Sequence, residues 1–146
     1  MSSSVIRVSV IIAALFLFVT VCIADANVIK PIPVELWHVG DDALSQRLAE
    51  KVESAFKRSP DFVLSSGRKQ GTLIASIPTN IEWKYVAKQT QVFYNVEFSS
   101  VDGKKIGLSK GSCWADELSK CATQIVRDAK SQRRKFSGRT VLRHRC

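Results

Sequence analysis

The sequence predicts one two-layer α+β domain, a sandwich with two amphipathic helices on one face of a mostly antiparallel mixed sheet. Three observations support this prediction. Residues 44–56 and 118–129 each carry a single apolar stripe at helical spacing. The segments between them alternate apolar and polar residues, as half-buried strands do. After removal of an apolar leader, about 120 residues remain, which is enough for one core but not for two.

Residues 1–26 are predicted to be a secretory signal peptide. Arg7 gives a weakly basic start, and residues 8–23 form an almost uncharged apolar run. Ala24 and Ala26 are small residues at the −3 and −1 positions of a cleavage site after Ala26, and cleavage after Ala24 is the alternative. The run of about 16 residues is shorter than the roughly 20 that span a membrane, so an uncleaved anchor is less favoured. We therefore expect a periplasmic or secreted protein without a transmembrane segment after cleavage.

The first half of the mature chain predicts a strand, a helix and a second strand. A lead-in over residues 27–33 precedes a strand over 34–39, rich in strand-forming residues. Asp41 or Asp42 can cap the helix that follows, and Pro60 ends it, because proline disfavours helical geometry in the preceding residue. Residues 62–66 then form a short strand, which the crossover through the helix can place parallel to the first. The apolar stripe of this helix consists of Leu44, Leu48, Val52, Ala55 and Phe56.

The second half predicts a meander of strands and a final helix. A basic turn over residues 67–71 leads into a strand over 72–77. Residues 81–85 alternate as a half-buried strand, and residues 90–99 show the cleanest alternation. Asp102-Gly103 predicts a tight hairpin turn with both central residues at positive φ, returning through residues 105–108. The final helix is expected from Glu117 to about Ser131, or one turn earlier from Trp114.

Three cysteines remain after cleavage, in a compartment where disulfides persist. If the last helix already includes Cys113, its sulfur lies about 12 Å along the axis from that of Cys121, too far for a bond. If Asp116 caps the helix, Cys113 can fold back, and Cys113–Cys121 becomes the disulfide candidate. The alternative is a buried apolar Cys121 beside a free Cys113. Cys146 is left over, mobile in the tail or bridged to another chain.

Most of the net charge of +9 lies near the C-terminus, because residues 130–146 hold seven Lys and Arg and no acid, whereas residues 27–129 hold 14 Lys and Arg against 12 Asp and Glu. We therefore divide the mature chain into a domain over residues 34–131 and a basic flexible tail over 132–146. Such a tail attracts anionic polymers such as lipopolysaccharide, wall polymers or nucleic acid. The alternative is a solvated tail that only aids solubility. The candidate anion-binding residues are Arg133, Arg134, Lys135, Arg139, Arg143 and Arg145.

No catalytic, metal-binding or cofactor-binding motif is found in the sequence. The chain has only 2 His, and these residues and the scattered carboxylates do not have the spacing of metal ligands. His38 beside Asp41 or Asp42 is a conceivable general base, but a hydrogen-bonded histidine at a strand end is the simpler interpretation. Aromatic residues on the expected strands can stack on bases or sugar rings, or simply fill the core. They are Trp37, Trp83, Tyr85, Phe93 and Tyr94.

Residues 34–129 resemble small domains of the bacterial envelope. In the string VELWHVGDDALSQRLAEKVESAF a strand leads through a turn into a long helix. This string and the element order resemble the N-terminal domain of the TolB family and the CsgG-like and LpoB-like families. The segment GSCWADELSKCA is similar to one in exported bacterial proteins of unassigned function. The lipid attachment usual in the CsgG and LpoB families has no counterpart, because bulky Val21 precedes Cys22.

This resemblance implies a non-enzymatic domain that binds a partner and carries over no catalytic residue. We therefore expect an exported interaction domain of the cell envelope, whose partner is an envelope protein or an anionic envelope polymer. The alternative is an anionic-polymer binder that acts through the basic tail. No specific nucleic-acid binding, cofactor or metal is expected.

Overall fold

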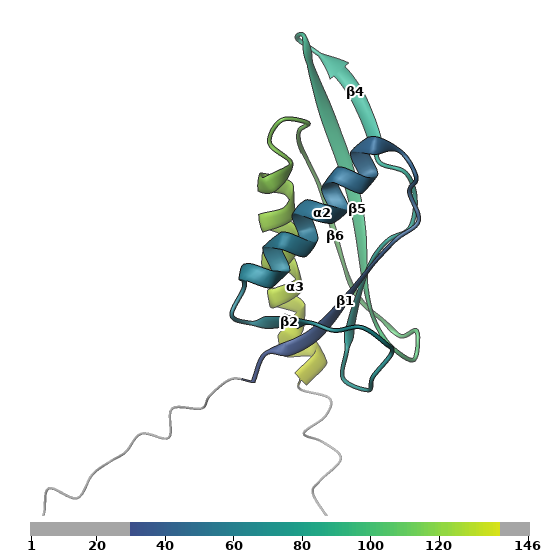
Figure 1. Ribbon diagram of the computed structural model, residues 1–146, viewed down its shortest axis with the longest axis vertical. Coiled ribbons are helices and arrows are strands. Elements are labelled where there is room, and N and C mark those ends of the chain that lie inside the picture. Colours follow the sequence, from purple (N-terminus) through teal and green to yellow (C-terminus); the bar gives the residue numbers. More distant parts are fainter. Residues whose placement is uncertain (1–29, 138–146) are drawn as a thin grey trace, which may run out of the picture.

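The computed structural model describes residues 30–137, so the predicted signal peptide and most of the tail lie outside the described residues. Two helices pack against a mixed, open sheet of 6 strands, which confirms the predicted α+β sandwich (Figure 1). The elements are β1 (Ile32–His38), α2 (Ala43–Arg58), β2 (Phe62–Leu64), β3 (Leu73–Ile77), β4 (Glu82–Val86), β5 (Gln89–Ser100), β6 (Lys105–Trp114) and α3 (Leu118–Ser137).

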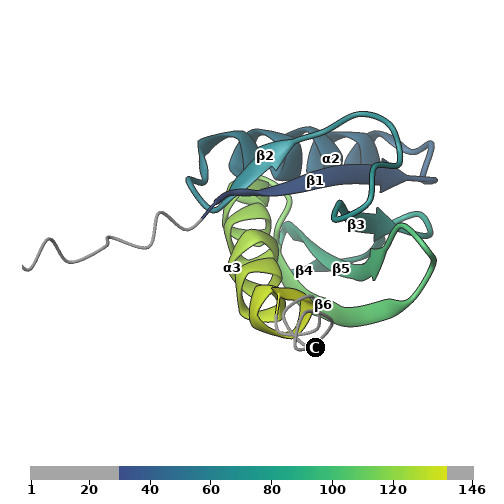
Figure 2. The same cartoon turned by 90° about the horizontal axis from the view of Figure 1, so that it is seen from below.

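The sheet is parallel on one side and antiparallel on the other. β1 lies between β2 and β3 and is parallel to both, as the crossover through α2 predicts. β5 is antiparallel to β3, β4 and β6. β6 pairs with β5 from Gln91 to Ser99, so β3 and β4 must share the opposite edge of β5. Seen from below, the sheet is curled, with α2 along β1 and β2 and α3 beside β6 (Figure 2).

The boundaries of α2 are those that local sequence signals predict. Asp42 is the N-cap, and its carboxylate accepts hydrogen bonds from the backbone N–H groups of Leu44 and Ser45. The helix ends at Arg58, two residues before Pro60. The buried face of α2 packs against α3 and the strands and forms part of the hydrophobic core. The fully buried side chains of this core include Leu48, Val52, Phe56, Val96, Phe98 and Ile125.

α3 extends further than the sequence predicts, to Ser137 rather than about Ser131. Its last turns are held against the start of the domain by Asp61, which precedes β2. The carboxylate of Asp61 pairs with Lys130 at 2.8 Å and with Arg133 at 2.9 Å. The Arg133 guanidinium also donates to the carbonyl of Lys30 at 2.7 Å. The helix therefore continues into the segment assigned to the tail, and Arg133 from that segment has partners in the fold.

The β5–β6 turn differs from the predicted one, and a turn of the predicted kind occurs between β4 and β5. At Asp102-Gly103 only the glycine has positive φ, +80°, so the prediction for Asp102 is wrong. Gly103 N–H donates to the carbonyl of Ser100 at 2.9 Å, in a loop one residue longer than the predicted turn. The two-residue turn with both φ angles positive joins β4 to β5 at Ala87 (48°) and Lys88 (66°). β6 also continues to Trp114, well past the predicted end at residue 108.

Candidate binding surface

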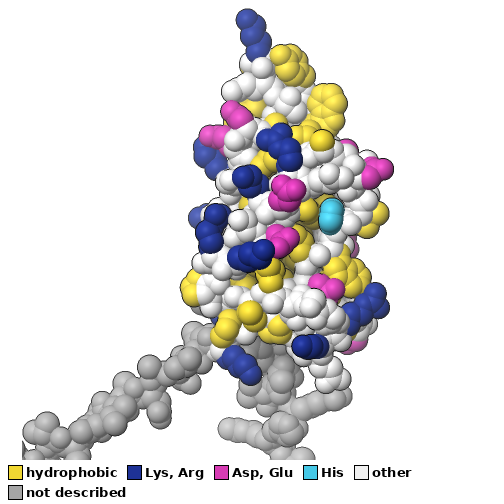
Figure 3. Space-filling model, in the orientation of Figure 1, with side chains coloured by type: hydrophobic (Ala, Val, Ile, Leu, Met, Phe, Trp, Pro, Cys, Tyr) yellow, Lys and Arg dark blue, Asp and Glu magenta, His cyan; other side chains and the backbone are white. Residues whose placement is uncertain are grey.

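The β4–β5 hairpin projects beyond the ends of both helices (Figure 1). Trp83 faces Val92 across the ladder and Tyr85 faces Thr90, so both aromatic side chains lie on the face that forms the core further along β5. No helix covers this part of the face, and Trp83 and Tyr85 are 59% and 69% exposed. The predicted half-buried strand is therefore wrong for these residues. Hydrophobic side chains are visible on the projecting end in Figure 3.

The base of the hairpin is fixed to the N-terminus of α2 by a polar cluster. The buried hydroxyl of Ser45 donates to the Asp42 carboxylate and accepts from the backbone N–H of Ile81 at 2.9 Å. Asn80 accepts from the backbone N–H of Asp41 at 3.1 Å. The hydrogen bond from Ser45 holds the pKa of Asp42 below its ordinary value. The hairpin therefore leaves the domain in a defined direction, although its outer part makes few contacts.

The opposite face of the hairpin and its outer edge are also open. Lys84 lies over the ring of Phe93, 5.4 Å from its centroid, and Val86 is 42% exposed. β4 pairs with β5 alone, and no strand of the described residues pairs with its other edge. The hairpin thus offers two exposed aromatic rings, an exposed valine, a lysine in its turn and an unpaired strand edge.

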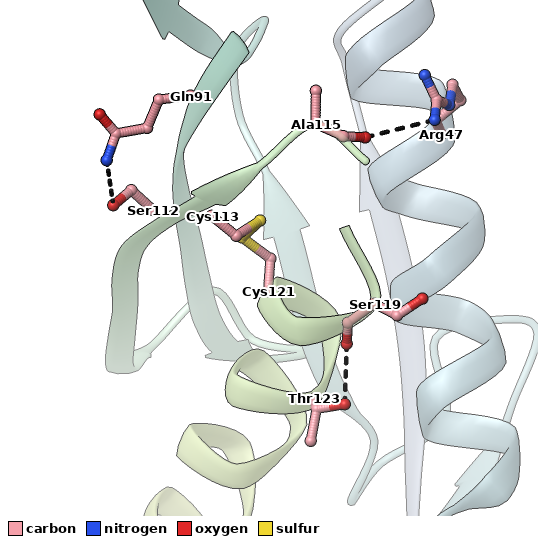
Figure 4. Close-up of a disulfide and its surroundings, with 8 residues drawn as sticks. All are labelled: Arg47, Gln91, Ser112, Cys113, Ala115, Ser119, Cys121 and Thr123. Carbon is pink, nitrogen blue, oxygen red and sulfur yellow. Dashed lines mark hydrogen bonds between the residues drawn. A yellow bond between two sulfur atoms is a disulfide. The ribbon is translucent and has the colours of Figure 1, made fainter. Parts of the chain in front are cut away.

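The predicted disulfide joins Cys113 to Cys121, with their Cα atoms 5.8 Å apart (Figure 4). It forms because β6 runs through Cys113 and α3 begins only at Leu118, so Cys113 lies outside the helix and folds back onto it. Nearby, the Arg47 guanidinium donates to the carbonyl of Ala115 at 3.4 Å and connects α2 to the same corner. The disulfide holds the end of β6 against α3. The other two cysteines, Cys22 and Cys146, lie outside the described residues.

Of the predicted anion-binding residues, the structure describes one side chain. Arg133 is 14% exposed and is bound to Asp61, as described above. This cation is therefore engaged inside the fold. The other candidates lie outside the described side chains: Arg134, Lys135, Arg139, Arg143 and Arg145.

The residues considered for general base chemistry do not form a catalytic pair in the described part of the chain. His38 is exposed at the end of β1, and no described hydrogen bond or ion pair joins it to Asp41 or Asp42. Asp42 caps α2, and Asp41 is bound to Asn80. Within residues 30–137 no group of His, Cys, Asp and Glu is arranged to hold a metal ion. No helix there is long and apolar enough to cross a membrane.

Comparisons with known proteins leave the family open. No protein-family model and no curated protein matches the sequence. Among solved structures, the fold is similar to a minor lipoprotein from Acinetobacter baumannii, with a TM-score of 0.41 and 10% sequence identity. The similarity covers 76% of this chain and 95% of that one. A likeness of this degree transfers neither an activity nor a binding residue.

Proposed function

We propose that the protein is an exported, non-enzymatic binding domain of the bacterial cell envelope, and that the β4–β5 hairpin is its contact with a protein partner. The observation that supports this most is the exposure of Trp83 and Tyr85 on a projecting strand. Tryptophan and tyrosine are enriched at protein interfaces and often dominate their binding energy. Location in the envelope rests on the predicted signal peptide and on the sequence resemblance.

A protein partner fits this hairpin better than a lipid surface. The outer edge of β4 presents backbone N–H and carbonyl groups that a strand of another protein can satisfy, whereas lipid tails cannot. The polar cluster at Ser45 and Asn80 orients the hairpin before binding, which lowers the entropy cost of association. The non-enzymatic part of the proposal rests on the sequence resemblance, which carries over no catalytic residue.

Photo-cross-linking in the encoding bacterium tests this proposal. Tyr85 is replaced by the photoreactive p-benzoylphenylalanine, and the same group is placed at exposed Arg127 on α3 as a control. We expect a discrete protein adduct from position 85 that is absent from position 127. Adding Trp83→Ala should reduce the adduct at least fivefold while leaving the thermal midpoint nearly unchanged, because surface substitutions seldom alter stability by more than about 0.5 kcal/mol.

Three outcomes would overturn the proposal. Equal adducts from positions 85 and 127 would show that the hairpin has no special role. An adduct that survives Trp83→Ala would place the contact elsewhere. Purified protein that binds anionic vesicles through Trp83, with a blue-shifted indole emission and no protein adduct in cells, would make the hairpin a membrane contact.

A further inference from the structure

A groove runs beside β1 where β2 stops short. β2 pairs with β1 only from Ile32 to Val34, although β1 continues to His38. Beyond the hydrogen bond from Ser65 N–H to the carbonyl of Val34, at 2.9 Å, the described chain leaves the edge of β1. The resulting groove has a volume of about 600 Å³, with β1 on one side and α2 on the other.

The backbone of β1 faces this groove with unused pairing groups. Val39 N–H donates to Ile77 of β3 at 3.1 Å, so the odd-numbered residues of β1 pair toward β3. N–H and carbonyl groups alternate sides along a strand, so those of Leu36 and His38 point the other way, into the groove. Four backbone groups, the N–H and carbonyl of Leu36 and of His38, are therefore available to a short extended peptide that continues the sheet where β2 ends.

The walls of the groove are acidic in a chain whose net charge is +9. Glu35 comes from β1, and Glu50 and Glu53 come from α2, whereas no Lys or Arg lines it. Glu53 pairs with Lys57 at 2.7 Å, and one carboxylate oxygen of Glu35 is buried without a hydrogen-bond donor. On the face shown in Figure 3, acidic side chains and a histidine lie near one another, with Lys and Arg side chains beside the acidic ones. Positive side chains on either face of an added strand would thus meet a carboxylate.

We propose that this groove binds an extended, lysine- or arginine-rich segment of a partner protein, which adds to the sheet beside Leu36 and His38 of β1. Backbone pairing supplies affinity, and Glu35, Glu50 and Glu53 select a basic sequence. This site is separate from the β4–β5 hairpin and does not depend on the function proposed for it.

The probe is a fluorescein-labelled seven-residue peptide of alternating Val and Lys, titrated with the full mature chain and followed by anisotropy. The variant Glu50→Gln/Glu53→Gln should weaken binding about five- to tenfold, the sum of two partly exposed charge pairs. Its matched control, Glu97→Gln/Glu117→Gln, changes the net charge equally outside the groove and should leave the affinity unchanged. Trp83→Ala should also leave it unchanged, which separates this test from that of the hairpin.

Peptide chemistry distinguishes strand addition from simple charge attraction. Methylation of the three central peptide nitrogens keeps the charge but blocks backbone pairing, and should weaken binding at least tenfold. Equal binding of the methylated peptide, or equal loss in the control variant, would overturn the proposal. So would tighter binding after Arg139, Arg143 and Arg145 are changed to Gln, because the chain's own tail would then be the occupant.

Discussion

Ser45→Ala should be one of the most destabilising single changes at the polar end of α2. The Ser45 hydroxyl is fully buried and makes two hydrogen bonds, one to the Asp42 carboxylate and one from the backbone N–H of Ile81. Removal leaves the Ile81 N–H buried without an acceptor, at a cost of about 1–3 kcal/mol. The lost bond to a partly exposed carboxylate adds about 1 kcal/mol more, so the total is about 2–4 kcal/mol.

Urea unfolding of the purified protein, followed by circular dichroism, measures this loss. With a slope of about 1.5–2 kcal/mol/M, a loss of about 3 kcal/mol moves the midpoint down by about 1.5–2 M. Ser131→Ala is the matched control, because Ser131 is exposed and its hydroxyl donates only to the carbonyl of Asp128 at 2.7 Å. The control should change the free energy of unfolding by less than about 0.5 kcal/mol.

The difference in free energy of unfolding between wild type and Ser45→Ala should also depend on pH. The Ser45 hydroxyl and two backbone N–H groups lower the pKa of Asp42 in the folded state. Its carboxylate therefore stabilises the fold above its unfolded pKa of about 3.9, and this stabilisation is lost as pH falls through the lower, folded pKa. We expect the difference in free energy of unfolding between wild type and Ser45→Ala to be largest near pH 7 and to become smaller below about pH 4. An unfolding midpoint within 0.3 M of wild type, or a gap that widens in acid, would refute this account of the cluster.

Two further predictions concern the disulfide and the C-terminal helix. Replacing Cys113 and Cys121 together with Ala opens a short loop, and chain entropy predicts that the free energy of unfolding in urea falls by about 2.5 kcal/mol. Reducing the disulfide of the wild-type protein should lower the free energy of unfolding by the same amount. Equal stability of the oxidised and reduced wild-type proteins would contradict this prediction. Arg133→Gln should lower the free energy of unfolding by about 1–3 kcal/mol, because Asp61 loses a partly buried charged partner and keeps only Lys130. Arg127→Gln, on the exposed side of the same helix, should have little effect. Equal losses for the two variants would show that the Asp61 contact does not stabilise the helix end.

Local sequence signals predicted the parts of the fold that depend on near neighbours in the chain. The start and end of α2 follow from Asp42 and Pro60, which act within one helical turn. The alternation of Val92, Tyr94 and Val96 placed one face of β5 in the core, because the side-chain period of a strand does not depend on its partner. The disulfide between Cys113 and Cys121 was also a candidate from local sequence, because its formation depended only on where the last helix begins.

Tertiary structure decided the features that depend on what lies opposite in space. The alternation at Trp83 and Tyr85 is that of a half-buried strand, yet both side chains are exposed because the helices end before they reach them. α3 extends to Ser137 because Asp61, far away in sequence, supplies a partner for its cations. The groove beside β1 exists because β2 stops after three residues. Periodicity fixes which way a side chain points, but only the packed elements determine whether anything covers it.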